Sequence, residues 1–585
     1  MRQPVQWADP VRGSELAAAL ASCRGAFVAT ALMSFMSNIL MLTGAIFMLE
    51  IYDRVLPSRS VPTLVALVLL AAGLFFAQGL LDIIRGRILL RIGVRLDEQL
   101  SDRVCETIMR LPLKVGSRSD GLQPLRDLDS VRSFLSGMGP TALFDLPWLP
   151  IYLAICFAFH PYIGFAALSG AIILGILTLL TEFMMREPTR AAASFAMKRM
   201  ALAESSRRNA EALKAMGMNR TIIAKWREVN RQFIASQQTA GDVAGGFGSI
   251  SRVLRIFLQS GVLAVGAYLV INQQATAGII IAGSILSARA LAPVDLAIGN
   301  WGGFVAARQS WGRLKQLLTA FPALKSPMPL QFPTRSLAVD NVAVVPPGGD
   351  RTVVHDVSFS LQCGQGLGII GPSGSGKSSL ARLLIGVWQP ARGSVRLDGA
   401  SLDQWAVDAL GAHVGYLPQD VELMAGTVAQ NIARFAEPPN ADAVVAAARA
   451  AGVHRLIVRL PDGYETQVGE NGAALSAGQA QRIALARALY GDPFLVVLDE
   501  PNSNLDAEGD EALSRAIMSV RARNGIVVVV AHRPSAILGV DRLLMMNQGR
   551  VQAIGPKDEV LAKVKRPEGA ARPLKVVPEA GSSKA

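Results

Sequence analysis

The sequence predicts an α-helical membrane domain followed by an α/β domain, and three observations support this prediction. The first half of the chain holds six apolar stretches, each close to the roughly 20 residues that a helix needs to cross a bilayer. The second half alternates β-branched runs with helical stretches, as in a domain with a largely parallel sheet. With 51% hydrophobic and only 18% charged residues, the 585-residue chain is too apolar for a wholly soluble protein.

The apolar stretches predict six membrane spans. They cover residues 26–49, 61–81, 141–159, 163–184, 253–271 and 275–291. The first stretch is too long for a signal peptide and has no small-residue cleavage site. Charge in lipid is costly, so Asp145 and Arg289 either face a transport pathway or lie near the membrane interface.

Lysine and arginine set the expected orientation. They gather in the two long connections, between spans two and three and between spans four and five. The connections on the opposite side hold only Arg54 and Arg59. The positive-inside rule therefore places both termini and the long connections in the cytoplasm. We expect these connections to be helical hairpins, which turn near residues 119–122 and 216–219.

A phosphate-binding loop opens the α/β half. It matches the pattern G-x-x-x-x-G-K-[ST] and lies between a predicted strand at 368–370 and a predicted helix at 379–384. Glycines let backbone N–H groups converge on a polyphosphate, and the helix N-terminus favours anions. We expect a lysine to reach the outer phosphates and a serine hydroxyl to bind Mg²⁺. The loop residues are Gly371, Pro372, Ser373, Gly374, Ser375, Gly376, Lys377, Ser378 and Ser379.

Two carboxylates end an apolar strand at residues 495–500. Such a strand end points at the ligand crevice of an open α/β sheet. Asp499 is therefore a predicted Mg²⁺ ligand, direct or through water, and Glu500 is the predicted base for the attacking water. Another buried strand, residues 526–530, leads to His532.

A short segment before these carboxylates resembles the L-S-G-G-Q signature of ATP-binding cassette (ABC) ATPases. An alanine replaces the first of its two glycines, and the other motifs follow in the family's order. The segment is Leu475, Ser476, Ala477, Gly478 and Gln479.

The resemblance implies roles for these residues. Gln419 would sense Mg²⁺ and the γ-phosphate, His532 would hold the γ-phosphate, and Asp506 would couple two sites. The signature would contact ATP bound to a second copy of the chain, so a homodimer with two ATP sites is expected. The methyl group of Ala477 would leave both sites competent. The family's adenine-stacking aromatic is missing near residues 344–347, which leaves open either weaker base binding or packing of valine or proline against the base.

Six spans before the cassette look like an ABC exporter, and four further segments resemble the bacterial type I protein secretion ATPases. This resemblance implies export of an unfolded polypeptide with a C-terminal signal, through the inner membrane, with a periplasmic adaptor and an outer-membrane channel. The alternative is an exporter of lipids or small hydrophobic molecules, which has the same architecture. The resembling segments are residues 50–58, 345–348, 417–428 and 549–557; residues 467–472 resemble the exporter segment that contacts the helical turns.

The hairpins are therefore expected either to pass motion to the ATPase or to be plain solvated helices. The net charge of +13 does not indicate nucleic acid, because the cations cluster beside apolar spans. Intact Lys377, Asp499, Glu500 and His532 argue against an ATP-inactive scaffold. The expected parts are an N-terminal segment 1–25, too short for a peptidase-like domain, a transmembrane domain 26–320, a linker 321–333, an ABC nucleotide-binding domain 334–565 and a disordered tail 566–585.

Overall fold

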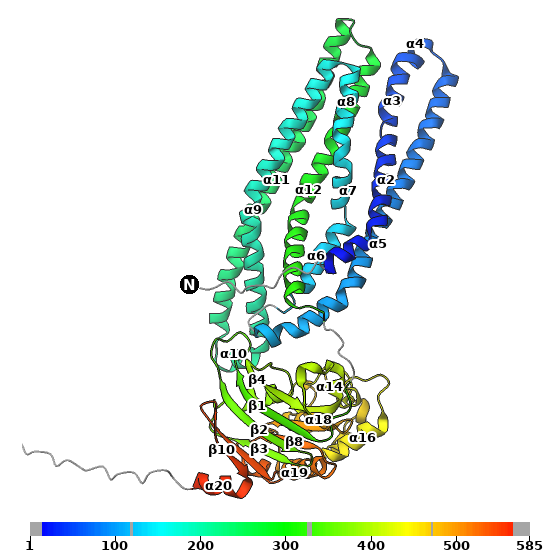
Figure 1. Cartoon of the computed structure of the whole chain (residues 1–585). Coiled ribbons are helices and arrows are strands. Elements are labelled where there is room, and N and C mark those ends of the chain that lie inside the picture. Colours follow the sequence, from blue (N-terminus) through cyan, green and yellow to red (C-terminus); the bar gives the residue numbers. More distant parts are fainter. Residues whose placement is uncertain (1–14, 117–120, 324–329, 470–471, 566–585) are drawn as a thin grey trace, which may run out of the picture. The chain divides into compact units, whose positions relative to one another are not determined.

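The computed structural model describes residues 15–116, 121–323, 330–469 and 472–565, and Figure 1 shows their arrangement in the chain. They divide into two units. The first unit holds the described residues within Met1–Ile108 and Asp120–Ala323, and it is helical. The second holds those within Met109–Ser119 and Leu324–Ala585, and it contains all the strands of the described residues.

Six helical segments of the described residues are long and apolar enough to cross a membrane, which confirms the predicted membrane domain. This finding rests on length and composition. The segments are Arg24–Ser58, Val61–Val115, Gly139–Phe159, Pro161–Arg208, Asn219–Ile271 and Ala277–Ala320.

The first and third segments are interrupted. In the first, a π-helical turn (Ile51–Val55) joins α3 (Thr43–Glu50) to α4 (Leu56–Ser58). In the third, a 3₁₀ turn (Leu146–Trp148) containing a proline separates two short helices. The helices of this unit are α1 (Glu15–Ser22), α2 (Arg24–Leu40), α3, α4, α5 (Val61–Val115), α6 (Gln123–Ser136), α7 (Gly139–Asp145), α8 (Leu149–Phe159), α9 (Pro161–Arg208), α10 (Ala210–Ala215), α11 (Asn219–Ile271) and α12 (Ala277–Ala320).

Helix α12 lies at the centre of the helix packing. In the most apolar stretch of α12, 56% of the residues are buried, compared with 6% in that of α5. Small residues such as Ala282 and Ala290 let it approach α8, α9 and α11 closely, where Tyr152 and Leu269 are buried. Small interface residues are the usual means of close helix packing in membranes. Helices α9 and α11 pack beside each other, as Figure 1 also shows.

A buried polar cluster joins α2, α5, α7 and α8. The guanidinium of Arg85 lies 3.4 Å from the carboxylate of Asp145 and donates to the hydroxyl of Ser34 at 3.0 Å. Asn38 donates to Asp145 at 2.8 Å and accepts from the Tyr152 hydroxyl at 3.0 Å. Asp145 is therefore enclosed among helices of its own unit and does not lie on an exposed face.

The N-terminus of α12 is capped by a residue from the π-helical turn. The Asp53 carboxylate accepts from the Gly278 N–H at 2.9 Å and from the Thr276 hydroxyl at 2.5 Å. A Cβ at position 278 would lie 2.7 Å from this carboxylate, so the contact needs glycine there. The first N–H groups of a helix have no partner within the helix, and an acidic side chain satisfies them.

The second unit contains two sheets. A four-stranded antiparallel sheet has the order β2-β1-β4-β5, and a six-stranded sheet has the order β10-β9-β3-β8-β7-β6. In the larger sheet β6, β7, β8, β3 and β9 run parallel, while β10 is antiparallel to β9. The strands are β1 (Ser336–Val344), β2 (Val354–Gln362), β3 (Gly366–Ile370), β4 (Arg392–Leu397), β5 (Ala400–Ser401), β6 (Val414–Leu417), β7 (Leu495–Asp499), β8 (Ile526–Val530), β9 (Arg542–Asn547) and β10 (Arg550–Pro556).

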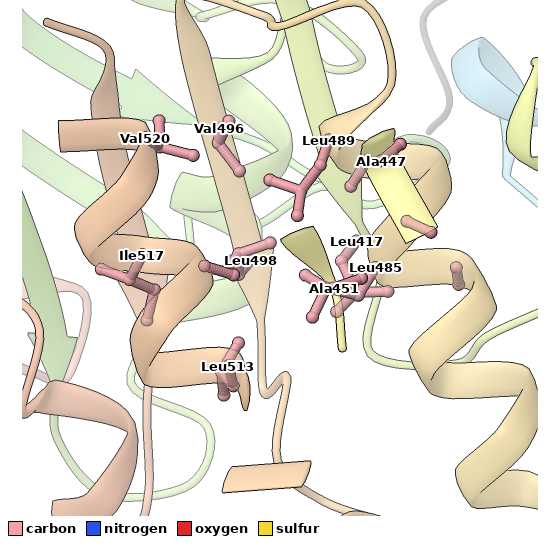
Figure 2. Packing of buried hydrophobic residues seen from close by; sticks show 14 of the residues in the cluster. Leu417, Ala447, Ala451, Leu485, Leu489, Val496, Leu498, Leu513, Ile517 and Val520 are labelled. Carbon is pink, nitrogen blue, oxygen red and sulfur yellow. The ribbon is translucent and has the colours of Figure 1, made fainter. Parts of the chain in front are cut away.

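Helices cover both faces of the larger sheet. Along β7, Val496 and Leu498 belong to one apolar cluster, while Leu495 and Val497 belong to another, as the two-residue period of a strand requires. Figure 2 shows the first cluster. The helices are α13 (Lys377–Leu384), α14 (Val407–His413), α15 (Val428–Ile432), α16 (Ala441–Ala450), α17 (His454–Val458), α18 (Ala477–Leu489), α19 (Ala507–Ala522) and α20 (Lys557–Lys565).

The predicted fold class is confirmed, and the structure adds the antiparallel sheet. Strand β2, which leads towards the phosphate loop, belongs to that sheet and not to the parallel one. The turn expected near 216–219 is present, between α10 and α11, whereas that near 119–122 lies partly outside the described residues. The domain boundaries stay predictions. The tail 566–585, most of the segment 1–25 and parts of 321–333 and 467–472 also lie outside the described residues.

Candidate functional site

The phosphate loop connects β3 to α13, as predicted. Gly376 ends it with φ +91, a conformation that L side chains rarely adopt. A Cβ at this position would lie 2.7 Å from the Val353 carbonyl oxygen, so glycine is required for a second reason. Helix α13 begins at Lys377, which places the loop at its N-terminus, where the helix dipole favours anions.

Lys377 is held across the loop by two backbone carbonyls. Its ammonium donates to the Gly371 oxygen at 2.9 Å and to the Pro372 oxygen at 2.8 Å. Burial lowers the pKa of this ammonium from its ordinary value, and the nearby carboxylates of Glu500 and Asp499 oppose that shift. The side chain is therefore a preoriented positive charge at the loop.

Asp499 and Ser378 supply oxygen ligands suited to a hard cation. The Ser378 hydroxyl donates to one Asp499 oxygen at 3.1 Å, whereas the other Asp499 oxygen is buried without a hydrogen-bond partner among the described residues. Burial raises the pKa of the Asp499 carboxyl above its ordinary value, and the hydrogen bond from Ser378 opposes this. An orphaned buried carboxylate oxygen beside a hydroxyl fits Mg²⁺, which prefers oxygen donors.

Glu500 follows β7 in a left-handed backbone conformation, with φ +50. Its N–H donates to the Val530 oxygen of the neighbouring strand at 3.0 Å. Its carboxylate lies 2.9 Å from Nε2 of His532, two residues beyond the end of β8. The two predicted catalytic side chains are therefore in contact at the carboxyl edge of the sheet.

Gln419 lies at the same edge of the sheet. It follows β6 by two residues, and β6 pairs with β7 through Leu417 and Leu498. Gln419 is exposed, like Ser373 and Gly374 in the loop. This arrangement places an exposed amide beside the strand that ends in Asp499.

The signature begins α18. Ser476 is the N-cap, and a capping box links it to Gln479: the Ser476 N–H donates to the Gln479 side chain at 2.9 Å, and the Gln479 N–H donates to the Ser476 hydroxyl at 3.3 Å. Ser476 and Ala477 are exposed. Leu475 packs against the core and anchors the segment. The exposed hydroxyl and N–H groups thus lie at a helix N-terminus on the surface of the unit.

Asp506 caps α19 and pairs with a residue that sequence reasoning missed. Its carboxylate accepts from the Gly509 N–H at 2.8 Å and forms an ion pair with Arg482 of α18. The Gly509 hydrogen bond lowers the pKa of the Asp506 carboxyl. The buried Gln481 beside Arg482 was missed as well. A signal was available, because Gln481, Leu485 and Leu489 recur at helical spacing on the buried face.

Together, the fold and this site define a membrane-bound ATPase with a phosphate loop. Two family models match the chain: "ABC transporter" over residues 354–503 and "ABC transporter transmembrane region" over residues 27–294. The type I secretion system ATP-binding protein PrsD of Rhizobium meliloti is 58% identical over 98% of this chain and 99% of its own length. The chain therefore belongs to the ABC transporters of type I secretion systems, and it couples ATP hydrolysis to transport.

Other relatives agree with this assignment. The cyclolysin secretion/processing ATP-binding protein CyaB of Bordetella pertussis is 30% identical over 91% of this chain and 75% of that protein. The alpha-hemolysin translocation ATP-binding protein HlyB of Escherichia coli is 27% identical over 93% and 78%. A solved structure of a bacterial Atm1-family ABC exporter with ATP bound shares the fold, with a TM-score of 0.76 at 23% identity, covering 93% of this chain and 97% of that one.

Proposed function

We propose that this protein exports unfolded polypeptides that carry a C-terminal signal, driven by ATP. The observation that carries the proposal is the 58% identity to PrsD, a type I secretion protein, over almost the full length of both chains. The names of more distant relatives refer to secretion or translocation of cyclolysin, toxin RTX-I and alpha-hemolysin. In this proposal the protein works as a homodimer, with a periplasmic adaptor and an outer-membrane channel.

The membrane half is proposed to lie in the bacterial inner membrane, with the ATPase and both termini in the cytoplasm. The distribution of lysine and arginine supports this orientation, because they gather in the two long connections. Helices α5, α9 and α11 hold 55, 48 and 53 residues, far more than the roughly 20 that a span needs. The surplus supports helical extensions that reach into the cytoplasm and pass motion from the ATPase.

The loop is proposed to hold the phosphates of ATP through the backbone N–H groups of residues 371–376. On ATP binding, the Lys377 ammonium would exchange its two carbonyl partners for phosphate oxygens. The new hydrogen bonds would be stronger, because both the donor and the acceptor are charged. Ser378, Asp499 and Gln419 are proposed to hold Mg²⁺, directly or through water. When bound, Mg²⁺ neutralises charge on the outer phosphates.

Glu500 is proposed to orient and polarise the water that attacks the γ-phosphate. Its contact with His532 supports this role, because the histidine would help to orient the carboxylate, and His532 is itself proposed to hold the γ-phosphate. In phosphoryl transfer most of the rate comes from such positioning and from electrostatic stabilisation. The signature residues Leu475–Gln479 would complete the site from a second chain, through the N-terminus of α18.

The test replaces the base with its isosteric amide. The change Glu500→Gln keeps the side-chain volume and removes the charge, so we expect ATP to bind with near-normal affinity while turnover falls by at least about 10²-fold. The measurements are ATP binding and phosphate release by the purified protein in detergent. Glu511→Gln, the same change at an exposed position of α19 away from the nucleotide site, is the matched control and should turn over ATP at a rate near that of the wild type.

A secretion assay tests the substrate. A strain without the gene should fail to release one protein with a C-terminal signal, and the wild-type gene, but not Glu500→Gln, should restore release. Unchanged secreted proteins with an altered membrane lipid composition would contradict polypeptide export. Normal hydrolysis by Glu500→Gln would contradict the assignment of the base.

A further inference from the structure

The loop that follows Glu500 is held against α18 at three points. Gly478 approaches it so closely that a Cβ there would lie 2.9 Å from the Asn504 carbonyl oxygen. Arg482 pairs with Asp506 at the far end of the loop. Between them Gln481 is 2% exposed and turns its amide into the loop backbone.

Both polar atoms of the Gln481 amide form hydrogen bonds with the backbone of that loop. Its nitrogen donates to the Pro501 oxygen at 2.6 Å and to the Glu500 oxygen at 3.4 Å. Its oxygen accepts from the Asn504 N–H at 3.1 Å. The Ser503 hydroxyl lies within 3.5 Å of both atoms. A buried amide that is satisfied in this way fixes the loop in one conformation, because any shift leaves a buried polar group unpaired.

Glu500 is the residue that most needs such support. Its backbone is left-handed, with φ +50. Residues other than glycine seldom adopt this conformation unless their surroundings hold them in it. On one side its N–H is held by the Val530 oxygen at 3.0 Å. On the other side its carbonyl faces the Gln481 amide and the Ser503 N–H. Hydrogen bonds therefore hold the backbone of Glu500 at both its N–H and its carbonyl group.

We propose that Gln481 is a positioning residue for ATP hydrolysis, because its buried amide holds the backbone of Glu500 in the conformation that aims the carboxylate at the attacking water. The proposal rests on the proposed role of Glu500 as the base. Gln481 and the signature serine Ser476 lie on the same helix, five residues apart. The position of the base is therefore tied to the helix whose N-terminus would meet the partner's ATP.

The test is the near-isosteric change Gln481→Glu, made in the full-length protein. It replaces the donor that faces the Pro501 and Glu500 oxygens with a carboxylate oxygen, so the loop is repelled. We expect kcat for ATP to fall between about 10-fold and 10²-fold, the loss that a small misplacement of a reacting group causes. KM for ATP should stay within about 2-fold of the wild type, because the phosphate loop is untouched.

A pH profile adds a second readout. A protonated glutamic acid is a donor again, so kcat of Gln481→Glu should recover relative to the wild type as the pH falls. Ile517→Val is the control for a loss of stability alone. Ile517 is 1% exposed, and Figure 2 shows its side chain on α19. The Ile517→Val variant should lower the melting temperature without changing kcat, KM or the pH profile.

Three outcomes decide the proposal. A lower kcat with unchanged KM and recovery at acid pH supports it. If Gln481→Glu behaves like Ile517→Val, with only a lower melting temperature, while Glu500→Gln blocks hydrolysis, the proposal is overturned. Normal hydrolysis by Glu500→Gln would instead overturn the role of Glu500 as the base. If Gln481→Glu does not fold, Gln481→Asn keeps an amide but shortens its reach by one carbon, and the same split between kcat and KM decides.

Discussion

At the scale of single residues, the nucleotide site concentrates charge that the folded protein does not favour in the absence of ligand. Asp499 lies at the end of a fully buried strand, with one carboxylate oxygen unpaired among the described residues. Burial raises its pKa, so folding favours the protonated form. The stability that this form contributes is present below the ordinary aspartate pKa and is lost as the pH rises through the raised value.

This leads to a prediction for Asp499→Asn. At neutral pH the neutral amide avoids the cost of the buried charge, so the nucleotide-free variant should melt at a higher temperature than the wild type, while hydrolysis is lost. The advantage should shrink as the pH is lowered, because the wild-type carboxyl then becomes protonated. Thermal unfolding of the purified, nucleotide-free protein over a pH series checks this. A variant that melts below the wild type at neutral pH would contradict the argument.

Most of the residues of the site could be predicted from the sequence, because its motifs demand particular side chains at fixed spacing. Lys377 and Ser378 follow from the loop pattern, and Asp499 and Glu500 from their place at the end of an apolar strand. Helical spacing puts Gln481 on the buried face of α18, but it does not show what the Gln481 amide contacts. Its partners are backbone atoms of a loop about 20 residues further on, and no sequence pattern records which backbone groups a side chain will meet.

At the scale of elements, the apolar stretches predicted where the spans lie, and the expected helical hairpins predicted that the helices extend beyond them. The predicted spans 61–81 and 163–184 are pieces of α5 and α9, which continue for tens of residues. A run of apolar residues ends at the first charged residues, whereas a helix can continue beyond them into water because its backbone hydrogen bonds are internal. The π-helical turn was not predicted, and neither was the hydrogen bond that its Asp53 accepts from α12, a helix more than 200 residues further along the chain.

The cap on α12 leads to a prediction for Asp53→Ala. The change leaves the Gly278 N–H and the Thr276 hydroxyl without this carboxylate, so it should destabilise the membrane unit by about 1 kcal/mol, as the loss of a helix cap does. Arg54→Ala, next to it and largely exposed, is the control and should have little effect. Thermal unfolding in detergent measures both variants. Equal melting temperatures for the two variants would show that the cap does not contribute to stability.

At the scale of the whole molecule, the separation of the motifs has a testable consequence. In one chain Lys377 of the loop begins α13, whereas Ser476 of the signature caps α18. If ATP is held between the loop of one chain and the signature of another, Lys377→Ala and Ala477→Asp, which places a negative charge at an exposed signature position, each disable both sites of a homodimer. A mixed dimer of the two variants, however, keeps one site in which both motifs are intact.

We therefore expect ATPase activity to return when the two variants are coexpressed with different tags and the mixed dimers are purified through both tags. Each variant expressed alone should be inactive. Mixed dimers that are as inactive as the separate variants would contradict a site shared between two chains. This experiment is independent of the transported substrate, since it reads only hydrolysis.

The order in which the chain is synthesised determines when Arg85 can meet each member of its polar cluster. Arg85 follows the predicted span 61–81, near the end of the membrane-crossing part of α5, where an arginine side chain can reach the membrane interface. Asp145 is synthesised 60 residues after Arg85, so this partner is missing when α5 leaves the ribosome. Asp82, three residues before Arg85 on the same helix, lies 3.0 Å from the guanidinium and is already present. In the order of synthesis, a carboxylate on its own helix is therefore available to Arg85 before the carboxylate of α7 is made.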